Sequence, residues 1–372
     1  MDAAGLIISE SYNKLSEKLT EKRTLAALPF ASKYRLIDFA LSNMVNSGIR
    51  NVGLIEGHKY NSLMDHVQSG SEWDLDRKHG GLTFLPPYSS AHCSDRSHNR
   101  LEALLNNHSY LRNLKEKHIV LCGTGYAGNV DFRKMVEFHQ SHQGDITYFF
   151  SSNVLNKEPL QNRLGVKTDA NHQITRISTN NTEALNADLA MATCVMERNY
   201  LLELIEELSH QTDAGVYPFL ISHLIHTQKI LAYTTDEMVI YMEDLPSYLT
   251  GSLALLDRKA QENLFHSPTG PIITKTKDSP ATYYGQDAQV ENSLIADGVT
   301  IEGQVRNCVI FRGARIKKGA VIENSVIMQD STVGENATLS YAVLDKKVIV
   351  NDGRNLSGYL THPFYCKRNE IV

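Results

Sequence analysis

The sequence contains little that would support a disulfide framework, a zinc site or a membrane span. Its five cysteines are scattered, odd in number and never arranged as Cys-x-x-Cys, which indicates reduced cytosolic thiols. No apolar run approaches the roughly 20 residues that a transmembrane helix requires. Residues 1–10 include Asp2 and Glu10 but no basic segment, so we expect no signal peptide. We therefore expect a cytoplasmic protein that does not associate with membranes.

The chain also lacks the basic excess of a nucleic-acid-binding protein. Its 372 residues include 37 Lys and Arg against 42 Asp and Glu, a formal net charge of -5. Proteins that bind DNA or RNA usually show a basic stripe, so nucleic acid is not an expected partner. The length favours about two domains, on a prior of roughly 150 residues each.

Apolar runs alternate with helical patterns over the first two thirds of the chain. Short buried-strand patterns occur at residues 3–9, 49–56, 118–123 and 145–150. Helical spacing of apolar residues occurs between them, at residues 36–47, 101–114 and 131–142. This alternation predicts a doubly wound α/β domain. The same domain is expected to include strands at 174–177, 187–196 and 231–242, and helices at 200–208, 217–227 and 252–263.

A different period begins after His266. Aliphatic residues recur every six positions, as at Ile310, Ile316 and Ile322, and "ENSLI" at Glu291 returns as "ENSVI" at Glu323. A period of six with interspersed glycines predicts a parallel β-helix of triangular coils, and it does not fit the 3.6-residue period of an α-helix.

The repeat region lacks histidine. Many hexapeptide-repeat proteins are acyltransferases, which generally use a histidine between coils as a general base. No histidine occurs between His266 and His362. We therefore expect the coils to form a spacer and an assembly surface, without a catalytic site.

The stretch TEKRTLAALPFASKYRLIDFALSNMVNSG, from Thr20 to Gly48, places Arg23, Lys33 and Arg35 among apolar residues ahead of an amphipathic helix that Gly48 ends. It resembles the sugar-phosphate nucleotidyltransferases, and specifically ADP-glucose pyrophosphorylase (glucose-1-phosphate adenylyltransferase). That family has Lys-Pro-Ala-x-Pro-Phe followed by Gly-Lys-Tyr-Arg-(Ile/Leu)-Ile-Asp-Phe. The resemblance implies a nucleotidyltransferase-like (Rossmann-like) α/β domain over residues 1–265 and a left-handed parallel β-helix over residues 266–372.

Enzymes of this family join a sugar phosphate to a nucleoside triphosphate and release pyrophosphate. Backbone N–H groups must cradle the triphosphate, Lys or Arg must meet the developing charge, and carboxylates must hold Mg²⁺. The family meets the first need with Gly-Gly-x-Gly-x-Arg-Leu directly after the first strand. Here the corresponding run is SESYNKLSEKLT, Ser9 to Thr20, which has no glycine or arginine and includes Glu10 and Glu17.

Two further active-site positions depart from the family pattern. The phosphate-binding Lys aligns with Leu25, while Arg23 either replaces that Lys in part or is a paired surface residue. Thr124, in Cys122-Gly-Thr-Gly-Tyr, stands at or near the metal-binding Asp of the family's Ser-Gly-Asp-His. A neutral hydroxyl binds Mg²⁺ far more weakly than a carboxylate does. Asp131 matches a helix start and is expected to be an N-cap.

The nucleotide and sugar motifs are eroded as well. The family's Gly-Thr-Ala motif is replaced around residues 99–101, and its Glu-Lys-Pro motif is absent at residues 177–183. By contrast, the run that begins at Asp213 still resembles the family's Asp-Phe-Gly motif near the sugar site. We therefore expect no catalytic residue, metal site or cofactor in this chain, and we expect Mg²⁺ only in a catalytic partner.

This pattern resembles the GlgD-type branch of the family, whose members pair with a catalytic homologue. The resemblance implies a regulatory, catalytically inactive subunit in bacterial glycogen biosynthesis, assembled with the catalytic ADP-glucose pyrophosphorylase subunit, most simply as a heterotetramer. Two alternatives stay open. One is an active adenylyltransferase with a divergent phosphate loop, and the other is a stand-alone sugar-phosphate-binding or scaffold protein.

Lys33 and Arg35 persist although the phosphate loop is lost. In catalytic relatives the matching Lys lies in an effector site for anions near the β-helix. The resemblance implies an anion site for phosphorylated sugar effectors, formed by Lys33 and Arg35 with Lys346, Lys347 or Arg354. The alternative is solvated surface charge or intersubunit ion pairs.

Overall fold

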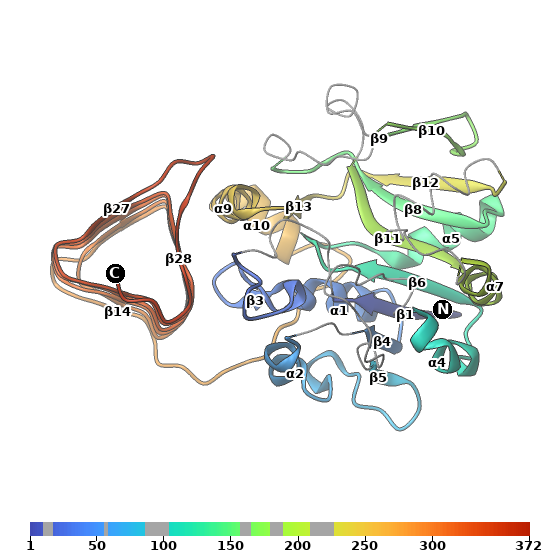
Figure 1. Cartoon of the computed structure of the whole chain (residues 1–372), viewed down its shortest axis with the longest axis horizontal. Coiled ribbons are helices and arrows are strands. Elements are labelled where there is room, and N and C mark those ends of the chain that lie inside the picture. The colour runs from blue at the N-terminus through green and yellow to red at the C-terminus, as the bar shows by residue number, and fades with distance from the viewer. Residues whose placement is uncertain (10–17, 56–58, 86–103, 157–164, 179–188, 209–226) are drawn as a thin grey trace.

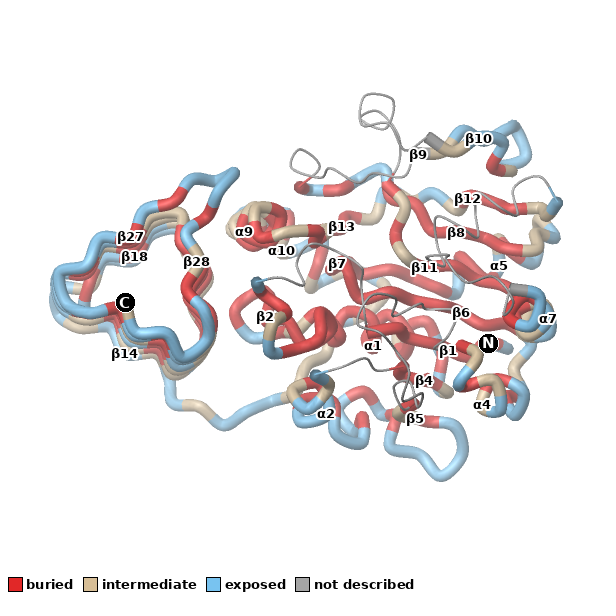
Figure 2. The backbone as a smooth tube through the Cα atoms, viewed as in Figure 1, coloured by how far each residue is buried: buried red, intermediate tan, exposed pale blue. Residues whose placement is uncertain are grey.

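The structure is a computed structural model of the whole chain, which describes residues 1–9, 18–55, 59–85, 104–156, 165–178, 189–208 and 227–372. An α/β domain and a triangular β-helix lie side by side, joined by the segment after α10 (Figure 1). Buried residues concentrate in the central sheet and along the inner face of the coils (Figure 2). The predicted fold class is confirmed: a doubly wound nucleotidyltransferase-like domain is followed by a left-handed β-helix.

A seven-stranded sheet forms the centre of the α/β domain, in the order β12-β8-β11-β6-β1-β4-β5. Most neighbouring strands are parallel, but β11 runs antiparallel to both β6 and β8, which the sequence did not indicate. The strand bounds are β1 Ala3–Ile8, β4 Asn51–Ile55, β5 Gly81–Leu85, β6 His118–Gly123, β8 Ile146–Ser151, β11 Leu189–Glu197 and β12 Ile230–Thr235.

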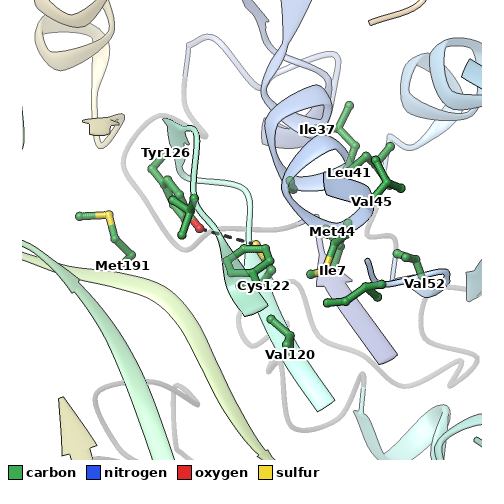
Figure 3. Close-up of a cluster of buried hydrophobic side chains, with 14 of the residues drawn as sticks. Ile7, Ile37, Leu41, Met44, Val45, Val52, Val120, Cys122, Tyr126 and Met191 are labelled. Atoms are coloured by element: carbon green, nitrogen blue, oxygen red, sulfur yellow. Dashed lines mark hydrogen bonds between the residues drawn. The ribbon is translucent and has the colours of Figure 1, made fainter. Parts of the chain in front are cut away.

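Helices cover both faces of this sheet, so its strands are buried on both sides. In β1, Ile7 belongs to the core beneath α1 (Leu36–Asn46) and α5 (Phe132–His142), whereas Leu6 belongs to the core beneath α4 (His108–Asn113) and α7 (Arg198–Leu208). This division follows from the period of two in a strand. Figure 3 shows the first core, in which α1 presents apolar side chains to the sheet: Ile37, Leu41, Met44 and Val45.

Local sequence signals predicted several helix boundaries. Helix α1 ends just before Gly48, which has a φ of +85°, and the Asp131 side chain caps α5 by accepting a hydrogen bond from the Arg133 N–H at 3.0 Å. The single helix expected at 252–263 is wrong. Two helices occur instead, α9 (Leu245–Ala254) and α10 (Arg258–Phe265), because Asp244 and Asp257 each cap a separate start. The helix expected at 217–227 lies outside the described residues, except for Thr227.

Smaller elements connect these parts. They are the 3₁₀ turns η2 (Leu25–Ala27) and η3 (Ser71–Trp73), helix α2 (Asn61–Val67), and the strand pairs β2 (Pro29–Phe30) with β3 (Tyr34–Arg35), β7 (Tyr126–Gly128) with β13 (Val239–Tyr241), and β9 (Gly165–Thr168) with β10 (Ile174–Ser178).

The β-helix consists of three parallel five-stranded sheets. Its interior is a stack of aliphatic ladders, and Ile310, Ile316 and Ile322 are fully buried there, as the six-residue period predicts. The first sheet contains β14 Tyr283–Tyr284, β17 Thr300–Ile301, β20 Arg315–Ile316, β23 Thr332–Val333 and β26 Ile349–Val350. The second contains β15 Gln289–Glu291, β18 Gln304–Arg306, β21 Val321–Glu323, β24 Thr338–Ser340 and β27 Asn355–Ser357. The third contains β16 Leu294–Ile295, β19 Val309–Ile310, β22 Val326–Ile327, β25 Ala342–Leu344 and β28 Phe364–Cys366.

The two domains share one hydrophobic core. Phe30 and Phe39 of the α/β domain belong to the same buried cluster as Phe311, Met328 and Val343 of the β-helix. Burial of apolar surface on both sides therefore holds the β-helix against the α/β domain. Among the described residues, no helix is long and apolar enough to cross a membrane.

The segment between the domains is bound along α1. Asp38, Ser42 and Asn46 are spaced four residues apart, so they lie on one helix face. Asp38 Oδ2 accepts a hydrogen bond from the Thr274 hydroxyl at 2.5 Å, Ser42 Oγ accepts one from the Ile273 N–H at 2.8 Å, and Asn46 Nδ2 donates one to the Pro271 carbonyl at 3.0 Å. The opposite apolar face of the same helix packs on the sheet, so α1 contacts the sheet and the connecting segment at once.

Candidate functional site

The edge at the carboxyl ends of β1 and β6 is where the family resemblance places the metal. Ser9 and Thr124 lie there, and both are essentially buried. The Thr124 hydroxyl donates a hydrogen bond to the Ser9 carbonyl at 3.4 Å. In the described part of the chain, no three His, Cys, Asp or Glu side chains gather closely enough to hold a metal ion. Residues at this position therefore do not fit Mg²⁺, because a buried neutral hydroxyl engaged with backbone replaces the carboxylate that the ion needs.

Several predicted positions cannot be placed. Residues 10–17 of the altered phosphate loop, including Glu10 and Glu17, lie outside the described residues. The same holds for residues 99–101, for residues 179–183 and for Asp213. The predictions for these positions stay predictions.

Leu25 and Arg23 both point into the protein. Leu25 lies in η2 and is buried in the core that the two domains share. Arg23 is only 2% exposed, and its Nη2 donates to both carboxylate oxygens of Asp345 in the β-helix, at 2.5 Å for Oδ2. Of the two sequence interpretations, pairing is confirmed, but the surface location is wrong. Arg23 ties the domains together across the interface.

Asp345 is the centre of a buried polar network. Besides the guanidinium, its carboxylate accepts a hydrogen bond from the Tyr365 hydroxyl at 3.1 Å and one from the Lys346 N–H at 2.6 Å. The Tyr365 hydroxyl also lies 3.0 Å from the Lys18 carbonyl of the α/β domain. Burial, together with the Asp345 charge, raises the pKa of Tyr365 above its usual value, so it stays a neutral hydroxyl. The carboxylate of Asp345 is thus surrounded by donors from both domains.

Positive charge gathers beside this network. Burial, together with the positive charges of Arg35 and Arg23, lowers the pKa of the Lys346 amine to about 6. Arg35 lies at the start of α1, where its N–H donates to Asp38 at 2.9 Å and its guanidinium donates to the Ser62 hydroxyl at 3.0 Å. Arg368 also acts on Lys346 and on Arg35. The cationic cluster therefore consists of Arg23, Arg35, Lys346 and Arg368, drawn from both domains.

The predicted anion-site residues are only partly gathered. Arg35 and Lys346 lie within electrostatic range of each other. Lys33 is exposed, with its ammonium 5.2 Å from the centre of the Tyr34 ring, and Lys347 and Arg354 are exposed on the β-helix. Sequence reasoning missed Arg368 and Asp345, because only the coiling of the β-helix brings them next to residues 23 and 35.

The fold and this interface define a class of protein. A doubly wound domain with a nucleotidyltransferase sequence, followed by a hexapeptide β-helix, is the architecture of sugar-phosphate nucleotidyltransferases. The family described as "Nucleotidyl transferase" matches residues 17–189, and "GlmU-like, C-terminal hexapeptide" matches residues 279–358.

Similar proteins narrow the class to one family. The chain is 32% identical to the "Glycogen biosynthesis protein GlgD" of Geobacillus stearothermophilus, over 85% of this chain and 82% of that protein. It is 31% identical to the protein of the same name from Bacillus subtilis, over 99% and 96% of the two chains. A "Glucose-1-phosphate adenylyltransferase" from Thermosipho africanus is 29% identical over 86% and 77%. The chain belongs to the family of GlgD glycogen biosynthesis proteins.

The Arg23–Asp345 pair gives a stability prediction. Arg23→Met should lower the free energy of unfolding by about 3–5 kcal/mol, because it leaves the Asp345 carboxylate buried without its charged partner. Urea denaturation of the full chain measures this difference. Arg258→Met, which breaks the exposed Arg258–Glu262 pair, is the matched control and should change the stability by less than about 0.5 kcal/mol. Equal effects of the two substitutions would contradict the role given to Arg23.

Proposed function

We propose that this chain is a regulatory, catalytically inactive subunit of glucose-1-phosphate adenylyltransferase in bacterial glycogen biosynthesis. The catalytic subunit of such an assembly makes ADP-glucose and pyrophosphate from ATP and glucose 1-phosphate. The observation that carries the proposal is that Thr124 and Leu25, at the metal and phosphate-lysine positions, are both buried in packing. The similar proteins, which include glycogen biosynthesis proteins and glucose-1-phosphate adenylyltransferases, support a role in glycogen biosynthesis.

The combined loss of the metal-binding carboxylate and the phosphate-binding lysine would account for the proposed lack of catalysis. Removing a single donor that stabilises developing charge typically costs about 10²–10³ in rate. Here the metal position has a hydroxyl and the phosphate-lysine position has an aliphatic side chain. The nearest arginine, Arg23, donates its guanidinium to Asp345. Without bound Mg²⁺ and a phosphate-binding cation, no positive group would neutralise the negative charge that develops on the leaving pyrophosphate.

The first coil of the β-helix supports association with a partner. Tyr284 and Val290 continue the interior ladders of Ile301 and Val305, yet they are 52% and 38% exposed. At the other end of the stack, the equivalent Val350 is 1% exposed, because residues 370–372 hydrogen-bond alongside β26. Open repeat ends and unpaired strand edges usually require a cap or a partner. A catalytic subunit with its own β-helix would supply matching strand edges, and a heterotetramer is the assembly we propose.

An activity assay tests the regulatory role. We expect the pure chain to release no pyrophosphate above background from ATP and glucose 1-phosphate. Mixed with the catalytic homologue, it should co-elute as a complex and change either the rate or the effector response of that enzyme. Turnover by the pure chain would support an active adenylyltransferase, and absence of any complex would support a stand-alone binding or scaffold protein.

The open coil gives a second prediction. Val290→Lys places a charge in the exposed interior ladder, so it should weaken the complex with the catalytic subunit at least about tenfold, equivalent to roughly 1.4 kcal/mol. Analytical ultracentrifugation of the mixture measures this change. Gln289→Lys, on an exposed outward-facing neighbour, is the control with the same added charge. If both substitutions weaken association equally, the effect is one of net charge and the apolar coil end is not the interface.

The cationic cluster supports an effector site for anions, which we propose binds phosphorylated sugars. The carboxylate nearest to Lys346, that of Asp345, is already paired with Arg23. Arg35 and Arg368 are therefore left as cations near Lys346 that lower the pKa of its amine, and Arg368 also lowers the pKa of Arg35. An anion between the domains would relieve this repulsion, and guanidinium groups bind phosphate oxygens in pairs. Lys33, Lys347 and Arg354 could contribute only from the exposed rim.

Sulfate, whose charge is constant near neutral pH, is a probe for this site. The pKa of Lys346 is lowered to about 6, so the amine loses its positive charge as the pH rises above that value. Because the protonated amine attracts the anion, sulfate affinity should fall as the pH rises from below 6 towards 8. Isothermal titration calorimetry across this range measures the trend.

Two variants test whether Lys346 is the source of the pH dependence of sulfate binding. Lys346→Met should weaken sulfate binding below pH 6 and remove the pH dependence, whereas Lys347→Met, on the exposed neighbour, should keep both. A pH dependence that survives in Lys346→Met would place the anion elsewhere.

A further inference from the structure

A polar cavity of about 630 Å³ lies at the sheet edge opposite to Ser9 and Thr124. It is formed where β6 and β8 begin and β11 ends, between the C-terminal turn of α5 and the first half of α7. These elements lie at the side of the α/β domain that faces away from the β-helix (Figure 1). The cavity is therefore separate from the emptied nucleotide site and from the cationic cluster. Its volume falls within the range of roughly 300–1,000 Å³ that is usual for small-molecule sites.

Two buried histidines line the cavity. His118 and His139 are 3% and 2% exposed, and their ring centres lie 5.7 Å apart, edge to face. His118 Nδ1 lies 3.2 Å from the Asp2 carbonyl and donates its proton to it, which leaves Nε2 for a ligand. His139 Nδ1 shares a hydrogen bond with Thr147 Oγ1 at 2.9 Å, and burial lowers the pKa of His139 to about 4. At neutral pH the His139 ring is uncharged.

Tyr200 of α7 lines the same cavity. Its hydroxyl is buried and has no hydrogen-bond partner in the described part of the chain, which is unfavourable for a polar group. Burial raises the pKa of Tyr200 to about 12, so the group remains a hydroxyl that can donate and accept. The hydroxyl has almost no accessible surface, so a ligand can hydrogen-bond it only after the Tyr200 ring turns towards the cavity.

The charges of the cavity restrict the ligand. The ammonium of Lys117 is paired with Glu197 at 2.9 Å, while Asp145 and Glu203 add further carboxylates. This excess of negative charge disfavours phosphate. Among the described residues, no three metal-ligating side chains converge, which disfavours a metal ion. The neutral His139 imidazole, with phenol, amide and carboxylate groups, instead presents donors and acceptors next to each other, and a hydroxyl is the group that satisfies both at a single atom.

We propose that this cavity binds a neutral polyhydroxylated ligand, a hexose unit, with Tyr200 and His118 among its hydrogen-bonding partners. The unit is either a free sugar or the end of a longer glucan, which share the same chemistry. The proposal goes beyond the regulatory role and does not depend on it, because it requires neither a catalytic partner nor an effector anion.

Calorimetric titration of the full chain with glucose, maltose and glycogen tests the proposal. We expect saturable binding of at least one of the three. Binding of glucose would identify a free-sugar site, and binding of maltose or glycogen alone would identify a site for a glucan end. No saturable heat with any of them would overturn the proposal.

Substitutions assign the binding to this cavity. Tyr200→Phe should weaken sugar binding about five- to tenfold, the usual consequence of losing one hydrogen bond. Its melting temperature should not fall, because the variant removes a buried hydroxyl that has no partner in the free protein. Glu203→Gln, on the exposed rim, should also weaken binding. Tyr283→Phe, on the β-helix, is the control and should bind as the unmodified chain does. Unchanged affinity in both Tyr200→Phe and Glu203→Gln would place the sugar elsewhere, for example at the sheet edge near Thr124, and would overturn the proposal.

Discussion

A guanidinium group buried to 2% exposure requires a carboxylate beside it, and in this protein the carboxylate comes from the other domain. The Arg23–Asp345 pair therefore fixes how the β-helix lies against the α/β domain. The pair sits next to the shared hydrophobic core, because Arg23 also contacts the sulfur of Met328 in that core. Desolvation makes such a pair a weak source of net stability, but it makes any arrangement that separates the partners very unfavourable. The interface thus has one specified geometry.

The positions that depart from the family's phosphate and metal motifs are accommodated by ordinary packing. Leu25 lies in the shared core, and the Thr124 hydroxyl bonds to backbone at the edge of the sheet. Each of these two side chains has a packing or hydrogen-bonding partner, although the buried Ser9 hydroxyl beside Thr124 has none among the described residues. Under the proposed function, positions that the family uses to bind phosphate and metal serve here as part of the scaffold.

Regular elements of the fold were predictable because their signals are local. The six-residue period located the coils, Gly48 located the end of α1, and Asp131 located the start of α5. The antiparallel direction of β11 was not predictable, because a buried strand has the same sequence pattern in either direction. The site was less predictable than the fold. Arg23 and Asp345 are 322 positions apart, and no local pattern relates an arginine to a carboxylate at that separation.

The two ends of the coil stack differ, because residues 370–372 cover β26 of the last coil, whereas Tyr284 and Val290 of the first coil are exposed. A building block with open surfaces at both ends polymerises into a filament, whereas one with a single open end is used up by the first contact. If the proposed assembly forms through the coil that begins at Tyr283, that contact joins two chains and leaves the covered β26 end outside it. The proposed heterotetramer would then need a second, chemically different surface, and pairing and tetramer formation would be open to separate regulation.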